Sequence, residues 1–223
     1  MKTSRIKIVE NILNANDQIA EENSRMLKKH HIYSINFMAA PGAGKTSLIL
    51  KTIQALSNDL RIAVIEGDTA PVTIDADKVQ ALGIPAIQIN TGGGCHLDAP
   101  MIRSGLAQLS LNKLDLVIIE NVGNLICPAS FKLGTNINVV IASVPEGDDK
   151  PYKYPNIYRG IDALILNKID LKPYIEFNES YFIKGIEILN PGVRFFEVSC
   201  KTGEGLNAWT DWLKEKIIRF KNE

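Results

Sequence analysis

The stretch AAPGAGKTS, residues 39–47, decides the fold of this chain. It matches the pattern G-x-x-x-x-G-K-[ST], with Ala39 at the position of the first glycine. An apolar run, HIYSINFM, precedes it and a helical pattern follows it, which is the strand–loop–helix context of a phosphate-binding loop. In such a loop, backbone N–H groups at a helix amino terminus cradle phosphate oxygens. The predicted phosphate-binding residues are Pro41, Gly42, Ala43, Gly44, Lys45, Thr46 and Ser47.

The same loop predicts a Mg²⁺–nucleotide site. Lys45 would neutralise the β and γ oxygens of a nucleoside triphosphate, and the Thr46 hydroxyl would ligate Mg²⁺. Two apolar runs end in carboxylates that could stand near this ion: RIAVIEGD ends at Asp68, and LDLVIIE ends at Glu120. The segment from Glu120 to Gly123 reads as a D-x-x-G switch with Glu in place of Asp. In that reading Glu120 holds a metal-bound water and the Gly123 N–H contacts the γ-phosphate.

Two further residues bear on hydrolysis. Asp75 lies seven residues beyond Asp68, where it could position the attacking water or cap the helix that follows. Asn124, rather than the common water-positioning glutamine, follows Gly123. We therefore expect slow intrinsic hydrolysis, on the order of 10⁻⁴ to 10⁻² s⁻¹. The predicted catalytic set is Lys45, Asp75, Glu120 and Gly123.

The base is predicted from NKID, residues 167–170, which matches N-K-x-D at the end of an apolar run. A carboxylate at Asp170 accepts hydrogen bonds from guanine N1–H and the 2-amino group, and adenine offers neither donor. The stem of Lys168 can lie on the base plane, and Asn167 can tie this loop to the phosphate loop. Backbone N–H groups of Ser199, Cys200 and Lys201, where S-A-K is usual, can reach guanine O6.

Short β-branched runs alternate with helical patterns along the whole chain after residue 31. This alternation predicts an α/β three-layer fold with a mostly parallel sheet of about seven strands and helices on both faces. The first thirty residues predict a helix with Val9, Ile12, Leu13, Asn16, Ile19, Ala20, Met26 and Leu27 on one face. It could cover the domain or bind a partner, and we favour a cover. We expect a single GTP-binding domain over 1–223, with 1–30 as an amino-terminal helical extension.

Composition excludes several classes of protein. Lys+Arg and Asp+Glu both number 25, which disfavours a nucleic acid or an anionic membrane as a partner. The chain has neither an apolar signal core nor a run of about 18 apolar residues, so we expect a cytoplasmic protein. Three cysteines do not make a disulfide framework, and Cys200 is expected to be a small buried side chain.

Cys95 and His96 are adjacent within NTGGGCHLDAP, and Cys127 lies four residues after Gly123. Thiolate and imidazole suit Zn²⁺ or Ni²⁺. Neither C-x-x-C nor H-x-x-x-H spacing is present, so the residues alone leave two readings open. One is an open or subunit-shared metal site, and the other is two buried thiols with a loop histidine.

The joint pattern AAPGAGKT, GDTAPVTIDADKV, NTGGGCHLDAP, ENVGNLICPA, EGDDKPYKYP and NKIDL resembles the HypB family of hydrogenase nickel-incorporation GTPases, over residues 10–215. The resemblance implies a P-loop GTPase fold of the SIMIBI type and a homodimer formed with GTP. It also implies delivery of Ni²⁺ to [NiFe]-hydrogenase, with a maturation chaperone and the hydrogenase large subunit as partners. On the matching positions, Cys95, His96 and Cys127 become ligands of Ni²⁺ or Zn²⁺ at the dimer interface.

One feature departs from the family and several rival readings stay open. Residues 1–37 contain no cysteine and only His30 and His31, so we do not expect the high-affinity nickel store of some members. Urease-type nickel GTPases and cobalamin-enzyme chaperones are the nearest rivals, but the urease type presents its ligands as Cys-Pro-His. A P-loop kinase with Lys150 and Lys153 in a substrate loop, or a scaffold that binds GTP without turnover, are the others.

Overall fold

The computed structural model describes residues 8–69 and 78–222, with side chains from residue 12 onward. Its centre is a seven-stranded sheet in the order β3-β2-β4-β1-β5-β6-β7, and every pairing in it is parallel. The strands are β1 (Tyr33–Ala39), β2 (Ile62–Asp68), β3 (Ala86–Asn90), β4 (Leu116–Glu120), β5 (Ile137–Ser143), β6 (Ala163–Asn167) and β7 (Arg194–Glu197). The predicted α/β class and strand number are confirmed, and the sheet is parallel throughout rather than mostly parallel.

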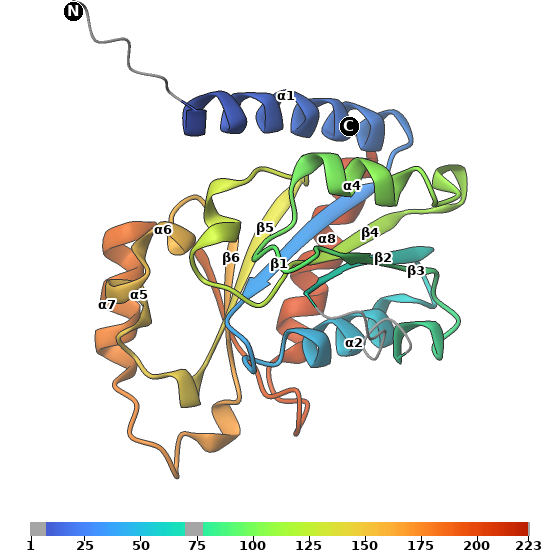
Figure 1. Ribbon diagram of the computed structural model, residues 1–223. Helices are drawn as coiled ribbons and strands as arrows, with labels where there is room; N and C mark the ends of the chain where they lie inside the picture. The colour runs from blue at the N-terminus through green and yellow to red at the C-terminus, as the bar shows by residue number, and fades with distance from the viewer. Residues whose placement is uncertain (1–7, 70–77, 223) are drawn as a thin grey trace, which may run out of the picture.

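Helices cover both faces of this sheet (Figure 1). One face carries α2 (Lys45–Leu56) and α8 (Leu206–Asn222), packed on alternate residues of the strands. The opposite face carries α1 (Ile8–Lys29) and α4 (Ala99–Leu106) over one half, and α6 (Pro155–Tyr158) and α7 (Glu179–Leu189) over the other. The short elements are η1 (Leu111–Lys113), η2 (Cys127–Ser130), η3 (Val144–Glu146), α5 (Lys150–Lys153) and η4 (Ile169–Leu171).

The strands are buried on both sides, which explains their nearly continuous apolar sequences. In β1, for example, Ile35 and Phe37 face α2 and α8, whereas Met38 faces the helices of the other layer. The polar motifs therefore fall beyond the carboxyl ends of the strands, where ligands bind in open α/β sheets. The phosphate loop joins β1 to α2 at this edge.

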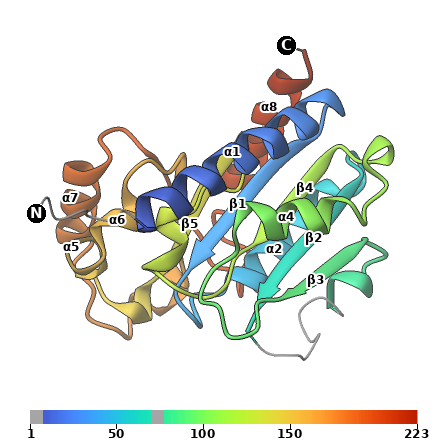
Figure 2. The same cartoon turned by 45° about the horizontal axis from the view of Figure 1, so that its top comes forward.

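Helix α1 lies along α4 on the outside of the sheet (Figure 2). Among residues 12–29, whose side chains the structure describes, the buried stripe of this helix consists of Asn16, Ala20, Asn23 and Leu27, spaced at three or four residues. The helix is thus a cover, as favoured from the sequence, but two of the four buried residues are amides. Ile12 was expected on the buried face and is instead 54% exposed, so this prediction was wrong.

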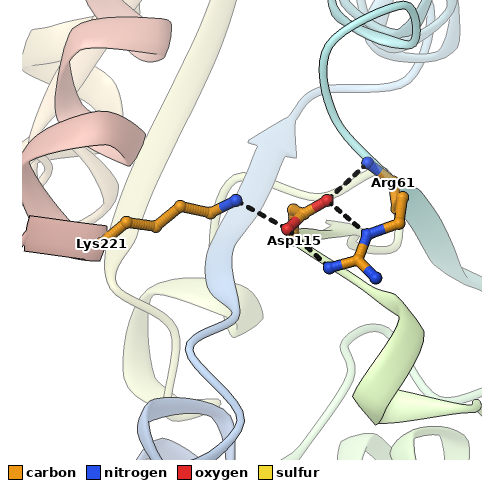
Figure 3. A network of polar contacts seen from close by, with 3 residues as sticks. All are labelled: Arg61, Asp115 and Lys221. Atoms are coloured by element: carbon orange, nitrogen blue, oxygen red, sulfur yellow. Dashed lines mark hydrogen bonds and ion pairs between the residues drawn. The ribbon is translucent and has the colours of Figure 1, made fainter.

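An ionic network lies at the amino ends of the strands, opposite the predicted phosphate loop. The Asp115 carboxylate accepts hydrogen bonds from Arg61 Nε at 2.8 Å, Arg61 Nη2 at 2.9 Å, the Arg61 backbone N–H at 2.9 Å and Lys221 Nζ at 2.6 Å (Figure 3). It joins the starts of β2 and β4 to the end of α8. Within residues 8–69 and 78–222, no helix combines the length and the apolar character needed to cross a membrane.

Candidate nucleotide and metal site

The backbone conformation of the phosphate loop depends on glycine. Gly44 precedes α2 with φ of +95°, and a Cβ there would lie 2.3 Å from Asn167 Nδ2. Gly42 also has positive φ, at +78°. Both positions therefore favour glycine. A cavity of about 440 Å³ adjoins the loop, lined by Ala40, Pro41, Gly42, Gly44, Lys45, Thr46, Ser47, Lys78 and Lys168.

Glu120 lies against the two loop residues predicted to handle phosphate and Mg²⁺. Its Oε1 accepts hydrogen bonds from Lys45 Nζ at 3.0 Å and from Thr46 Oγ1 at 2.7 Å. The pair with Lys45 is almost fully buried. Asp68 ends the neighbouring strand, and its Oδ1 accepts a hydrogen bond from the Thr69 backbone at 2.6 Å. An arriving anion would compete with Glu120 for Lys45, and a cation would find the Thr46 hydroxyl and the Glu120 carboxylate side by side.

Gly123 and Asp75 are the two remaining residues of the predicted catalytic set. Gly123 sits against the phosphate loop, since a Cβ there would lie 3.3 Å from the Pro41 nitrogen. Asp75 falls outside the described residues, so both of its readings stay predictions. Glu66 was not singled out from the sequence, yet it is buried and lies in register with Glu120 on the adjacent strand. The signal was an acidic residue inside the apolar run IAVIEGD.

Asn167 joins the second predicted loop to the first. Its Nδ2 donates to the Ala43 carbonyl at 2.9 Å, and its Oδ1 accepts from the Cys200 backbone N–H at 3.2 Å. Lys168 adopts φ of +61°, and its Nζ donates to the Gly42 carbonyl at 2.7 Å. The phosphate loop and both base-side loops are therefore one connected structure.

The base-side pocket has a volume of about 410 Å³ and is lined by Gly44, Ser47, Asn167, Lys168, Asp170, Leu171, Cys200 and Lys201. It shares Gly44, Ser47 and Lys168 with the phosphate cavity, so the two form one continuous groove. In it, Asp170 Oδ1 accepts a hydrogen bond from the buried Ser199 Oγ at 2.6 Å. Burial raises the pKa of the Cys200 thiol to about 11, which keeps this cysteine neutral and unsuited to bind metal.

Cys95, His96 and Cys127 come together although 30 residues of chain separate the last two. One ligand atom from each lies within 4.8 Å of the others, and all three residues are half-buried. Cys95 Sγ and His96 Nδ1 are 3.7 Å apart. The His96 ring stacks on Phe131, with centroids 3.9 Å apart, so the stack also joins the two segments.

The electrostatics of this cluster favour a neutral imidazole at His96 and a protonated thiol at Cys95. Burial lowers the pKa of His96, against the opposing effect of the Asp98 carboxylate, which favours the neutral imidazole. A hydrogen bond with Cys127 and burial raise the pKa of the Cys95 thiol. The thiol must lose a proton to ligate a metal, so binding and proton release are linked.

Two asparagines connect the cluster to the segment after β4, and sequence reasoning missed both roles. The buried Asn121 accepts a hydrogen bond from the Leu97 backbone N–H at 3.1 Å through its Oδ1. Asn124 Nδ2 donates to the Cys95 carbonyl at 3.2 Å. Residues 120–127 therefore contact the phosphate loop at one end and contain a metal-ligand candidate at the other. Between these ends, the segment is hydrogen-bonded to the loop of Cys95.

Comparisons with known proteins find relatives over most of this chain. The family model described as "CobW/HypB/UreG, nucleotide-binding domain" matches residues 34–197. The hydrogenase maturation factor HypB of Rhizobium leguminosarum bv. viciae is 44% identical over 214 residues, which is 96% of this chain and 71% of that protein. The hydrogenase/urease maturation factor HypB of Helicobacter pylori is 40% identical over 215 residues, covering 95% and 88% of the two proteins.

Two solved structures share the fold over nearly their whole length. The crystal structure of HypB from Helicobacter pylori in complex with nickel has a TM-score of 0.87 and 39% identity, covering 92% of this chain and 96% of that one. The crystal structure of HypB from Archaeoglobus fulgidus has a TM-score of 0.85 and 38% identity, covering 92% and 99%.

Proposed function

The chain belongs to the HypB family of hydrogenase maturation factors, and we propose that it is a GTP-hydrolysing switch that carries nickel. GTP with Mg²⁺ occupies the groove along the phosphate loop, and Ni²⁺ is the cargo at Cys95, His96 and Cys127. The nickel is passed to a hydrogenase maturation chaperone and the hydrogenase large subunit in the cytoplasm. The relative from Helicobacter pylori is named for both hydrogenase and urease, so urease stays the alternative recipient.

The observation that carries this proposal is the shared segment 120–127. Glu120 contacts Lys45 and Thr46 at its start, and Cys127 stands in the thiol–imidazole cluster at its end. Nucleotide phosphate and metal are thus sensed by one short piece of chain. A buried carboxylate beside a lysine cannot keep that contact unchanged when phosphate oxygens bind the same lysine.

In the proposed cycle, the phosphates of GTP take Lys45 from Glu120, and Thr46, Glu120 and Asp68 would hold Mg²⁺, which would neutralise charge on the phosphate oxygens. The displacement passes through Asn121 and Asn124 to the Cys95 loop, because both amides are bonded to its backbone. Slow hydrolysis then restores the first arrangement and changes the affinity for nickel. Since binding linkage is reciprocal, nickel must change nucleotide affinity by the same factor.

The metal cluster also supports a homodimer formed with GTP. Within the part of the chain that the structure describes, the cluster has three candidate ligands, fewer than the four of a closed structural site, which suits a site shared with or completed by a second copy. Ile126, next to Cys127, is 64% exposed and would be covered by such a contact. Zn²⁺ accepts the same ligands, so the proposal names nickel as cargo and zinc as its competitor.

Guanine is the base that fits the second pocket. Asp170 is held at its edge by the Ser199 hydroxyl, and a carboxylate in that place is matched by the two donors of guanine. Lys150 and Lys153, considered for a kinase substrate loop, instead lie on α5, where Lys150 stands over Tyr154 and Lys153 pairs with Asp149. That arrangement does not favour the kinase reading.

The test measures nickel affinity with GDP, with a non-hydrolysable GTP analogue and without nucleotide, alongside phosphate release from GTP and ATP. We expect one thiol-dependent nickel site that changes affinity with the nucleotide, and phosphate release from GTP alone. Cys127→Ala should weaken nickel binding and abolish the nucleotide effect, whereas the matched control His31→Ala, at an exposed histidine, should do neither. Unchanged nickel stoichiometry and affinity in Cys127→Ala would exclude the coupling.

A further inference from the structure

Helix α1 is bonded to both segments that carry the metal-ligand candidates. Asn16 Oδ1 accepts from the Ala99 backbone N–H at 2.9 Å, and Asn16 Nδ2 donates to the Lys132 carbonyl at 2.9 Å. Ala99 lies three residues after His96, and Lys132 lies directly after Phe131, the ring that stacks on His96. One amide thus spans the two sides of the metal cluster.

Asn23 repeats this connection two turns farther along the helix. Its Nδ2 donates to the Ala99 carbonyl at 2.9 Å and to the Leu133 carbonyl at 3.1 Å. Both polar groups of Ala99 are therefore held by α1, as are the carbonyls of two successive residues in the segment that follows η2. The two asparagines are almost or fully inaccessible to solvent.

A helix that only covered the sheet would use apolar residues on this stripe. Burying an amide is costly unless its hydrogen bonds are made, and an apolar side chain would give the same cover without that cost. Amides add direction, because a hydrogen bond fixes the position of its partner within a few tenths of an ångström and an apolar contact does not. The buried amides therefore set where the two segments stand, besides covering them.

Glycine on the second segment supports the same reading. Gly134 has φ of +91°, and a Cβ there would lie 2.2 Å from the Ala20 carbonyl oxygen, between the two asparagines on the helix. The segment after Cys127 thus lies directly against the backbone of α1, too close for a side chain at position 134. This close contact restricts movement of the segment relative to the helix.

We propose that α1 is the element that sets the spacing of the metal site, with Asn16 and Asn23 as its positioning residues. They hold the loop of Cys95 and His96 at a fixed distance from the segment of Cys127, without touching the metal. Any displacement of α1 along the sheet then loosens the site and lowers its affinity for nickel. This inference rests on the proposed role of the three residues as nickel ligands.

The test compares Asn16→Ala, Asn23→Ala and the double variant with the full-length parent. Nickel affinity is measured by titration, and the ligand geometry by the absorption spectrum of Co²⁺ at the same site. The metal-free spacing is measured by the rate at which a short bifunctional thiol reagent links Cys95 to Cys127. Leu27→Ala is the matched control, because Leu27 is buried on the same stripe and packs in the core below it.

We expect each single asparagine variant to weaken nickel binding about tenfold and the double variant more, the range for residues that orient metal ligands. The Co²⁺ spectrum should change and the thiol linking should slow. Leu27→Ala should lower the melting temperature comparably and leave all three readouts within about twofold of the parent. Gly134→Ala displaces α1 from the other side and should reproduce the asparagine phenotype, which keeps the test usable should the double variant not fold.

Asparagine variants that keep the parent affinity, spectrum and linking rate would overturn the proposal, as would a Leu27→Ala variant that loses as much affinity as they do. Failure of the proposed function has a different signature. In that case the parent itself would bind nickel no better than Cys127→Ala, while the thiol-linking rates would still report whether α1 fixes the spacing.

Discussion

Replacing Asp170 by Asn should turn the preference of the pocket from GTP to XTP. The Ser199 hydroxyl donates to Asp170 Oδ1 at 2.6 Å, and in the variant it can continue to donate only to the amide oxygen. That bond turns the amide NH₂ toward the base. A guanine donor would then face a donor, whereas xanthine presents a carbonyl oxygen in place of the 2-amino group.

The size of the effect follows from the bonds exchanged. Guanine loses a hydrogen bond to a charged acceptor, about 1.5–3 kcal/mol, and leaves a donor unpaired, about 1–3 kcal/mol. A total of about 2.5–6 kcal/mol corresponds to roughly 10²- to 10⁴-fold weaker GTP binding. XTP should gain by a comparable factor, and ATP should stay a poor ligand for both proteins.

Competition by GTP, XTP and ATP against a fluorescent GDP analogue measures these affinities. Asp149→Asn is the matched control, since Asp149 pairs with Lys153 on α5 and does not line the pocket. It should leave all three affinities unchanged. If Asp170→Asn binds GTP within about threefold of the parent and gains nothing for XTP, Asp170 does not contact the base and the guanine assignment is wrong.

Three further predictions concern stability, protons and backbone strain. Asp115→Asn should unfold roughly 2–6 °C lower, because the Arg61 side chain is 60% exposed and water screens its charge, so the variant loses about 1–1.5 kcal/mol, and each kcal/mol lowers the melting temperature by about 2–4 °C at this chain length. An unchanged melting temperature would contradict this argument. The Arg61 guanidinium, with Lys221, holds the pKa of Asp115 well below its usual value, so this stabilisation is present above about pH 4 and is lost as pH falls further, and acid melts of the variant should be less pH-dependent than those of the parent. As pH falls, nickel affinity should drop about tenfold per pH unit for each thiol that must lose its proton to bind the metal, including Cys95 with its raised pKa. A nickel affinity that does not change between about pH 6.5 and 8 would exclude thiolate ligands. Gly44→Ala should abolish nucleotide binding, because positive φ and the approach of Asn167 both forbid a side chain, and near-parent affinity would show that the loop adapts.

The fold could be predicted from the sequence because its signals are local. A strand buried on both faces needs an apolar run of about six residues, and a helix covering it needs apolar residues with a 3.6-residue period. Each element can therefore be recognised within a short window of sequence. The signals of the loops predicted to bind phosphate and base are also local, because glycines at positive φ, such as Gly44, stand at fixed offsets from the predicted binding residues. These were the predictions that the structure confirmed or placed together.

The contacts of buried amides could not be predicted in this way. Asn16 bonds to Lys132 across 116 residues, and Asn23 to Leu133 across 110. An asparagine on a helix is usually exposed or capping, and nothing in its neighbours along the chain distinguishes the buried case. Asn16 was placed on the right face from its spacing, but Asn23 and the links made by Asn121 and Asn124 were missed. Their partners are backbone groups, which every residue has, so the sequence carries no matching signal.

The contacts around Glu120 also limit how strongly the two proposed sites can act on each other. The Lys45–Glu120 pair is almost fully buried, so phosphate binding must break it and replace it with contacts of similar strength. The part of the coupling that reaches the Cys95 loop is carried by two amide hydrogen bonds worth about 0.5–1.5 kcal/mol each. Their sum, about 1–3 kcal/mol, corresponds to a change of about 5- to 150-fold in nickel affinity between nucleotide states. A change of that size suffices to release a weakly held ion on hydrolysis, whereas a tightly held ion would stay bound in both states. Coupling through these two bonds would therefore release only a weakly held nickel ion.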